Sequence, residues 1–558
     1  MVAQVNALFP SAAWRAANAV HLCALTWGRS CPPGNASAIV RRFASSAAAS
    51  TTSAGVVNSE SFTAAEASEP PPAWPGARSG ARVLSALVST PWLGDACGLV
   101  DAFRAGELSP AEALEDCIAA IHKSPLNAFS FTDFERARDA AVRADVSRPF
   151  GGVPFGVKEL EKVAGWPDSR ASVVFRDRVA GHDDTSVVRL RSTGALLAAQ
   201  TTAPEFGLLN CTSSVLHGTT RNPWNQERTP GGSSGGTAAA VAGGLLPIAT
   251  GSDGGGSIRG PAGFSGLFGL KATYGRIPKG PDGTIEPMTT VLGCVTRSVR
   301  DTARYFDACN GFDRRDPLSL PRVEDWEAAL GSHDLSGLTA AITVDLGIAQ
   351  VRDEVAEVVV AAAAQLSRAA GLRMVAVQPT LPPLRGAWSL SNVPPRVVDL
   401  DDAYPDRIDE LSLELILELR SAQERYTLER AASIELYRRQ LNEAMAVLFD
   451  QADFVFCSTH PDVAFSAEGP PPSTLPGRDL IHEIGFTRAI MNNAALTAPS
   501  NLNGSPAVSI PAGVVDGLPV GLQVLAGHHR EQLLLDLALV AEREMPWPLV
   551  APASPHVA

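Results

Sequence analysis

The chain has 558 residues, of which 45% are hydrophobic and 19% are charged, so it is long enough to bury a large core as soluble globular proteins do. Its formal net charge of −13 argues against a nucleic-acid-binding protein, which usually carries a basic face. No segment approaches the roughly 18 apolar residues of a membrane-spanning helix, so we expect no membrane partner.

The beginning of the chain differs from the rest. The first acidic residue is Glu60, and the arginines before it stand among many Ala and Ser residues, with no lysine. Such a segment is typical of a disordered extension, an organellar transit peptide or a start codon assigned too early. We expect residues 1–85 to be a disordered or targeting-like leader with a Pro-rich linker, 86–550 to be one catalytic domain, and 551–558 to be a flexible tail. The expected location is cytoplasmic, with an organelle as the alternative if residues 1–59 are a transit peptide.

The helices and strands expected in chain order alternate, which indicates an α/β sheet. Residues 98–123 predict two helices separated by a turn at Gly106, and the second begins with a capping box in which Ser109 is the cap, Pro110 the first helical residue and Glu112 the partner. Residues 184–200 and 236–250 each predict a helix followed by an apolar strand.

The second half of the chain begins with a Pro-rich segment, residues 375–410, which we expect to be irregular. Residues 411–449 predict long amphipathic helices rich in Glu and Arg. Residues 452–465 and 505–526 predict strands that return to the sheet. The eight cysteines form no CxxC pair, so we expect isolated, reduced thiols, no metal site and no cofactor.

The segment from Thr229 to Gly263, TPGGSSGGTAAAVAGGLLPIATGSDGGGSIRGPAG, holds twelve glycines and four serines around an apolar centre. It does not contain the GxxxxGK[ST] spacing of a phosphate-binding loop or the GxGxxG spacing of a dinucleotide fold. GGSSG satisfies GxSxG, but a polar loop precedes it instead of the strand that a nucleophile elbow requires.

The motifs GVPFGVKE, TPGGSSGGTAAAVAGG and GSDGGGSIRGPAGFSGLFGLKATYGRIP resemble those of the amidase signature family. The resemblance extends over roughly residues 90–545. It implies a single large α/β domain with a central mixed β-sheet covered by helices on both faces. It also implies amide hydrolysis by a Lys–Ser–Ser triad on a small-molecule amide.

Carried over by the resemblance, the base is Lys158, the bridging serine after a cis peptide bond is Ser233, and the nucleophile is Ser257. Ser234, Asp253 and Arg259 are expected to support them. Glu159 and Ser252 stand where the family often has Asp and Thr, and both changes keep the functional group.

This chemistry requires an uncharged lysine. Ser257 can attack only if its proton leaves, and Ser233 can accept that proton while passing its own to Lys158. An unperturbed lysine has a pKa of about 10.4, so neutrality at pH 7 costs about 4 to 5 kcal/mol unless burial lowers the pKa. The apolar residues Val153, Phe155 and Val157 predict such a buried setting.

The glycines before Ser257 suit an oxyanion hole. Backbone N–H groups stabilise the negative charge that develops on a carbonyl oxygen, and residues without side chains allow close approach. The resemblance assigns this role to Gly254, Gly255, Gly256 and the backbone of Ser257, and it places Gly207 beside the bound substrate.

Three functions remain open from the sequence. The first is a stand-alone amidase for small or aryl amides, with esters or carbamates as further substrates. The second is an amidotransferase A-type subunit that releases ammonia from glutamine within a complex, and the third is a non-enzymatic binding protein. A homodimer is also left open. We expect pocket walls from residues 375–410 and 458–490, with core packing the simpler role for Trp388, Phe465 and Phe486.

Overall fold

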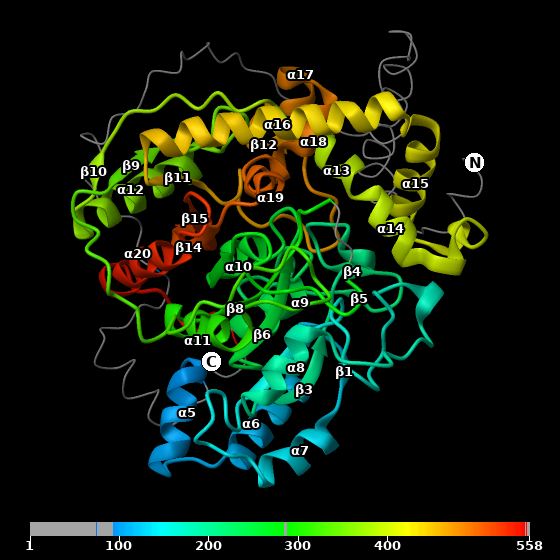
Figure 1. Cartoon of the computed structure of the whole chain (residues 1–558), viewed down its shortest axis with the longest axis vertical. Helices are drawn as coiled ribbons and strands as arrows, with labels where there is room; N and C mark the ends of the chain where they lie inside the picture. Colours follow the sequence, from blue (N-terminus) through cyan, green and yellow to red (C-terminus); the bar gives the residue numbers. More distant parts are fainter. Residues whose placement is uncertain (1–73, 75–92, 284–286, 385, 553, 555–558) are drawn as a thin grey trace.

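The computed structural model describes residues 74, 93–283, 287–384, 386–552 and 554 (Figure 1). The expected leader and linker lie outside the described residues, apart from Trp74. At the other end, Ala551 and Ser554 are buried, and the backbone N–H of Ala551 donates to the carbonyl of Ala242 at 2.7 Å. Residues 551 and 554 therefore pack against the folded body, and 553 and 555–558 of the expected tail lie outside the described residues.

A mixed sheet of 11 strands forms the centre of the molecule. In spatial order its strands are β1 (Phe129–Thr132), β3 (Leu196–Thr201), β2 (Pro154–Lys158), β6 (Ile248–Asp253), β8 (Val291–Thr296), β7 (Phe268–Lys271), β14 (Ala507–Val515), β15 (Leu518–Leu525), β11 (Phe454–Ser458), β9 (Thr339–Ile342) and β10 (Arg373–Met374). The pairs β2–β3, β2–β6, β9–β11 and β9–β10 are parallel, and the other pairs are antiparallel. Two short hairpins, β4–β5 (Ser213–Ser214, Gly218–Thr219) and β12–β13 (Thr474–Leu475, Arg478–Asp479), lie outside this sheet.

Helices cover both faces of the sheet. Every residue of β2, β3, β6, β7, β11 and β15 is buried, and successive side chains of a strand point to opposite faces, so neither face meets solvent along these strands. The helices are α5 (Ala96–Ala105), α6 (Pro110–Lys123), α7 (Phe134–Val142), α8 (Thr185–Ser192), α9 (Gly235–Ala242), α10 (Arg259–Ser265), α11 (Val299–Cys309), α12 (Asp353–Ala369), α13 (Ala387–Ser391), α14 (Val393–Leu400), α15 (Leu413–Arg425), α16 (Leu428–Gln451), α17 (Leu480–Ile484), α18 (Phe486–Ala495), α19 (Ala498–Asn503) and α20 (Glu531–Glu544). The predicted α/β fold is confirmed.

The predicted start of α6 is confirmed in detail. The Ser109 side chain accepts from the backbone N–H of Glu112, and the Glu112 carboxylate accepts from the backbone N–H of Ser109. Pro110 fills the first helical position, where no N–H is needed.

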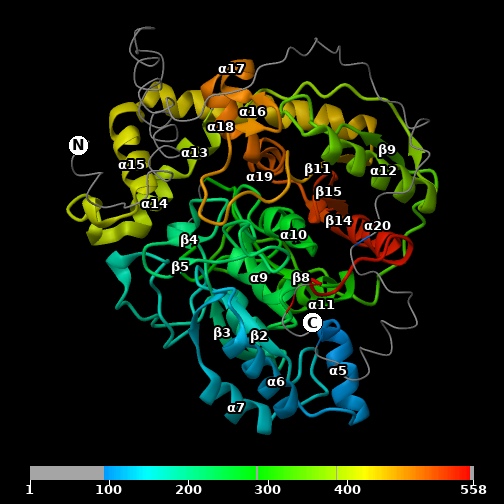
Figure 2. The same cartoon turned by 180° about the vertical axis from the view of Figure 1, so that it is seen from behind.

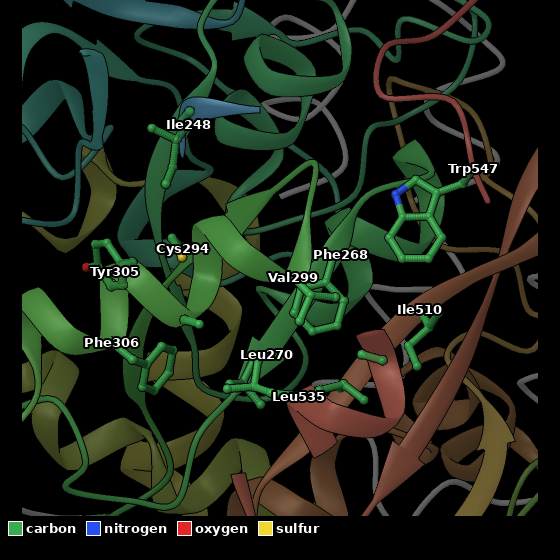
Figure 3. Close-up of a cluster of buried hydrophobic side chains, with 14 of the residues drawn as sticks. Ile248, Phe268, Leu270, Cys294, Val299, Tyr305, Phe306, Ile510, Leu535 and Trp547 are labelled. Atoms are coloured by element: carbon green, nitrogen blue, oxygen red, sulfur yellow. The ribbon is translucent and has the colours of Figure 1, made fainter. Parts of the chain in front are cut away.

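One apolar core joins the sheet to its helices. Figure 3 shows the part in which Phe268 and Leu270 of β7 and Ile510 of β14 lie near Phe306 of α11 and Leu535 of α20. All of these side chains are buried. This core fixes the positions of the central strands, and with them the polar residues at the ends of β2 and β6.

Residues 375–410 are not irregular throughout, which corrects the expectation from their proline content. They contain α13 and α14, and α14 has proline at its start, where a missing N–H costs nothing. Apolar residues of α14 and α15 pack with Val174 and Phe175, which precede them by more than 200 positions in the chain. Helices α13 to α18 lie at one end of the molecule, and α5 to α7 lie at the other (Figures 1 and 2).

Candidate active site

The site begins where two neighbouring parallel strands end. Strand β2 pairs with β6 in parallel, and β2 ends at Lys158. The backbone N–H of Lys158 donates to the Thr250 hydroxyl of β6 at 2.9 Å. Because the carboxyl ends of adjacent parallel strands meet at one edge, Lys158 lies next to Ser252, near the end of β6.

Three serine hydroxyls surround the amine of Lys158. Its Nζ atom lies 2.8 Å from the Oγ of Ser233, 2.9 Å from that of Ser234 and 2.9 Å from that of Ser252. Ser233 and Ser234 immediately precede α9, and the peptide bond between Gly232 and Ser233 is cis. A neutral amine has two N–H donors and one lone pair, so it can donate to two of these hydroxyls and accept from the third.

The Lys158 side chain is completely buried, and burial lowers its pKa to about 7. The carboxyl groups of Glu161, Asp253 and Glu159 act in the opposite direction, because negative charge favours the ammonium form. The buried setting predicted from the apolar residues around Lys158 is therefore present.

Ser257 lies on the loop between β6 and α10 and lines a cavity of about 230 Å³ together with Ser233 and Ser252. The backbone N–H of Ser234 donates to the carbonyl of Ser257 at 3.3 Å, which joins the two serine loops. In the part of the chain that the structure describes, the Ser257 hydroxyl makes no hydrogen bond, to Ser233 or to any other residue. The structure thus brings Lys158 and Ser233 into contact and places Ser257 at the same cavity.

The predicted oxyanion glycines divide into two kinds. Gly254 and Gly255 line the cavity. Gly256 is not among the lining residues, and its N–H donates to Asp253 Oδ1 at 2.7 Å, so this N–H already has an acceptor in the structure. No acceptor occurs among the described residues for the N–H groups of Gly255 and Ser257, so these two groups are available to a ligand.

Asp253 and Arg259 form a buried pair beneath the Ser257 loop. Both are completely buried, and Arg259 Nη2 lies 2.9 Å from Asp253 Oδ1. The Asp253 carboxylate also accepts from the backbone N–H of Ile258 at 3.2 Å. The Arg259 guanidinium reaches Gln523 on β15 at 2.7 Å and the Ser500 hydroxyl on α19 at 2.8 Å. The pair therefore ties the loop to the sheet and to α19.

Gly207 lines the cavity beside Ser233, as expected, with a φ of +68°. A Cβ atom there would lie 2.8 Å from Leu160 Cδ1 and 3.2 Å from Ser233 Oγ. Only glycine suits both this backbone conformation and this space.

The cavity wall contributed by α13 and α14 matches the expected pocket walls only in part. Trp388, Asn392, Pro395, Arg396 and Asp399 line it, so residues 375–410 do form a wall. Residues 458–490 do not line this cavity, and Gly469 to Pro471 line a separate pocket instead. Trp388 packs against the core, which was the simpler role expected for it. Its indole N–H also donates to the carbonyl of Gly254 at 2.6 Å, so it contacts the Ser257 loop as well.

No cluster of metal-binding side chains occurs among the described residues, and the six cysteines they include are free and buried. None of the helices among these residues has both the length and the apolar character needed to cross a membrane. The cavity thus offers hydroxyls, a buried amine and backbone N–H groups, which can activate a serine and stabilise an oxyanion.

Comparisons with known proteins agree with this chemistry. The family model described as Amidase matches residues 112–535. The chain is 31% identical over 476 residues to an acylamidase of Rhodococcus erythropolis, covering 83% of this chain and 97% of that protein. It is 34% identical over 456 residues to the A-type subunit of glutamyl-tRNA(Gln) amidotransferase from Akkermansia muciniphila, covering 78% and 96%.

Solved structures show the same relationship. A bacterial aryl acylamidase of the amidase signature enzymes matches with a TM-score of 0.74 and 27% identity, covering 82% of this chain and 97% of that chain. A 6-aminohexanoate cyclic dimer hydrolase matches with a TM-score of 0.73 and 28% identity, covering 83% and 99%. The chain therefore belongs to the amidase signature family and is a hydrolase of carbon–nitrogen bonds.

Proposed function

We propose that this amidase cleaves small acyl or aryl amides through an acyl-enzyme on Ser257, with Lys158 as the base and Ser233 as the proton relay. The observation that carries the proposal is the amine of Lys158, which is buried without an ion-pair partner among the described residues and lies 2.8 Å from Ser233. A neutral amine in this position can accept a proton, and Ser257 lines the same cavity.

In the first step the Ser257 oxygen forms a bond to the amide carbon. Its proton passes to Ser233, whose own proton passes to the lone pair of Lys158. The carbonyl electron pair moves to oxygen, where the N–H groups of Gly255 and Ser257 stabilise the charge. When the C–N bond breaks, the proton on Lys158 returns through Ser233 to the leaving nitrogen.

Water then attacks the acyl carbon while one of its protons passes through Ser233 to Lys158. When the bond to Ser257 breaks, that proton returns through Ser233 to the Ser257 oxygen, which releases the carboxylic acid. Amides, esters and carbamates all present a carbonyl group that the serine can attack. The acyl-enzyme route therefore extends to esters and carbamates as further substrates.

Apolar groups of Trp388, Phe206, Leu160 and Leu292 line the cavity, and they support aryl or alkyl acyl groups of modest size. The names of the acylamidase and aryl acylamidase relatives support the same class. The similarity to the A-type amidotransferase chain leaves glutamine hydrolysis within a complex as the second candidate.

The test is a panel of chromogenic amides, esters and carbamates, with glutamine added, assayed with wild type and Ser257→Ala. We expect hydrolysis of aryl amides by the purified chain and a loss of at least about 10³-fold in Ser257→Ala. A fluorosulfonyl probe should label the wild type at Ser257 and leave Ser257→Ala unlabelled.

Full activity in Ser257→Ala, or labelling at another serine, contradicts the proposed nucleophile. Glutamine hydrolysis without aryl amide hydrolysis selects the amidotransferase alternative. Gel filtration of the same sample tells a monomer from a homodimer.

A further inference from the structure

A second buried ionisable side chain, Glu161, lies three residues after Lys158. The backbone N–H of Glu161 donates to the Lys158 carbonyl at 2.8 Å, so the end of β2 turns back on itself there. The exposed fraction is 0% for Lys158 and 2% for Glu161. Glu161 also contributes to the wall of the cavity that holds Ser257.

Neither side chain has an ion-pair partner within 4 Å among the described residues. Lys158 is surrounded by hydroxyl groups, whereas Glu161 has one hydroxyl at Oε2 and its buried Oε1 has no hydrogen-bond partner among the described residues. The Ser186 hydroxyl donates to Glu161 Oε2 at 2.8 Å, and three serine hydroxyls surround Lys158. An isolated buried charge is costly, whereas a hydroxyl can serve a neutral amine or a neutral carboxylic acid equally well. Burial without a counter-charge therefore favours the uncharged form of both groups.

The electrostatics agree with this geometry. The pKa of Glu161 is raised to about 7, chiefly by burial; the Asp184 carboxylate adds to this rise, and the hydroxyls of Thr250 and Ser186 and the amine of Lys158 act against it. Since burial also brings the pKa of Lys158 to about 7, the two groups titrate in one range and influence each other.

Carboxylates act on both members of this pair, and the cationic side chains of Lys162 and Arg170 line the same cavity. Asp184 faces Glu161 from the start of α8, and Asp253 and Glu159 face Lys158 from β6 and from the residue after β2. Cys294 of β8 and Tyr305 and Cys309 of α11 also act on the surroundings of Glu161; burial raises the pKa of all three, so they stay neutral at pH 7.

We propose that Glu161 is a positioning residue that sets the charge of Lys158: as a neutral acid it leaves the amine uncharged, and as a carboxylate it draws a proton onto it. The inference rests on the proposed role of Lys158 as base. The negative charge of Glu161 stabilises the ammonium form, so the activity of the wild type rises at a higher pH than Lys158 alone would dictate.

The test is the pH profile of kcat/KM for wild type, Glu161→Gln and Glu161→Met with one aryl amide. Both substitutions remove the ionisable group at similar length, and the methionine variant covers the case in which glutamine folds poorly. In both variants we expect the acid limb, the part of the profile where kcat/KM rises with pH, to move to lower pH by about 0.5 to 1 unit. One unit below the wild-type midpoint, the activity relative to the plateau should rise about 3- to 6-fold.

Glu542→Gln is the matched control. Glu542 is a largely buried carboxyl of α20 whose pKa burial raises to about 7, and it accepts from the backbone N–H of Val299 at 3.2 Å. It is not among the groups that act on Lys158, so its substitution should leave the limb in place.

An unmoved acid limb in both Glu161 variants overturns the inference, and so does a uniform fall in kcat at every pH without a shift. Lys158→Ala separates this failure from failure of the proposed function. If Lys158→Ala is inactive while the Glu161 variants keep the wild-type limb, only the role of Glu161 is wrong. If Lys158→Ala keeps full activity, the proposed base is wrong as well.

Discussion

The indole N–H of Trp388 donates a hydrogen bond of 2.6 Å to the carbonyl oxygen of Gly254. This bond connects α13 directly to the loop that carries Ser257, although the two residues are 134 positions apart in the chain. The carbonyl of Gly254 belongs to the same peptide unit as the N–H of Gly255. The indole therefore helps to orient an N–H group that the proposed mechanism uses.

Trp388→Phe tests this connection, because phenylalanine keeps most of the apolar wall and removes the donor. A hydrogen bond of this kind contributes about 0.5 to 1.5 kcal/mol, so we expect kcat to fall about 2- to 10-fold with a smaller change in KM. Trp388→Ala should raise KM as well, since it also opens the wall. Steady-state kinetics of both variants check this, and wild-type kcat in Trp388→Phe would show that the bond has no part in turnover.

The pKa of Lys158 predicts how activity depends on pH. Burial lowers that pKa to about 7, and only the unprotonated amine can accept a proton. Activity should therefore be high above about pH 7 and fall up to about tenfold per unit below it. Lys158→Met should lose about 10²-fold or more across the whole range. A wild-type profile of kcat/KM that begins to rise only above about pH 9 would contradict a depressed pKa.

Gly207→Ala should damage the site rather than the fold. A Cβ atom at this position would lie 2.8 Å from Leu160 Cδ1 and 3.2 Å from Ser233 Oγ, so we expect kcat/KM to fall about 10-fold or more as Ser233 is displaced. Gly106→Ala is the matched control, because Gly106 has a φ of +70° and nothing within 4 Å of the added Cβ. Both variants carry a similar backbone cost, which thermal melting measures. Equal activities in the two variants would rule out a specific effect at Ser233.

The Asp253–Arg259 pair should contribute strongly to stability. Although burial favours protonation, the Arg259 guanidinium holds the pKa of Asp253 well below its usual range. Asp253→Asn leaves a buried guanidinium without its counter-charge, so we expect a loss of about 3 to 5 kcal/mol in unfolding free energy at pH 7. Asp139→Asn, at an exposed carboxylate of α7, should change it by less than about 0.5 kcal/mol.

This contribution has a definite pH dependence. The folded-state pKa of Asp253 is depressed, so its stabilisation is complete above the unfolded pKa of about 4 and is lost as the pH falls below that value. Denaturant unfolding at pH 7, 5 and 3 should show a constant difference between wild type and Asp253→Asn at the two higher values and a smaller one at pH 3. A difference that is the same at all three would mean that Asp253 is not ionised in the folded protein.

Local patterns predicted much of this protein. The capping box of α6 and the helix–strand pairs α8–β3 and α9–β6 follow from residues within a few positions of one another, because hydrogen bonds at a helix end and the period of a strand are local properties. The long glycine- and serine-rich motif identified the family, since so specific a pattern rarely arises by chance.

The sequence by itself determined the α/β class, the family and the residues around which the site is built. Only the tertiary structure decided what surrounds them. Ser252 is the third hydroxyl at Lys158, the Trp388 indole contacts Gly254, and Asp253 accepts from the Gly256 N–H. Glu161 is a second buried ionisable side chain at the cavity. The reason is physical. A pKa near 7 for Lys158 and the direction of an N–H group depend on burial and on contacts between segments far apart in the chain, and no short pattern of residues encodes these.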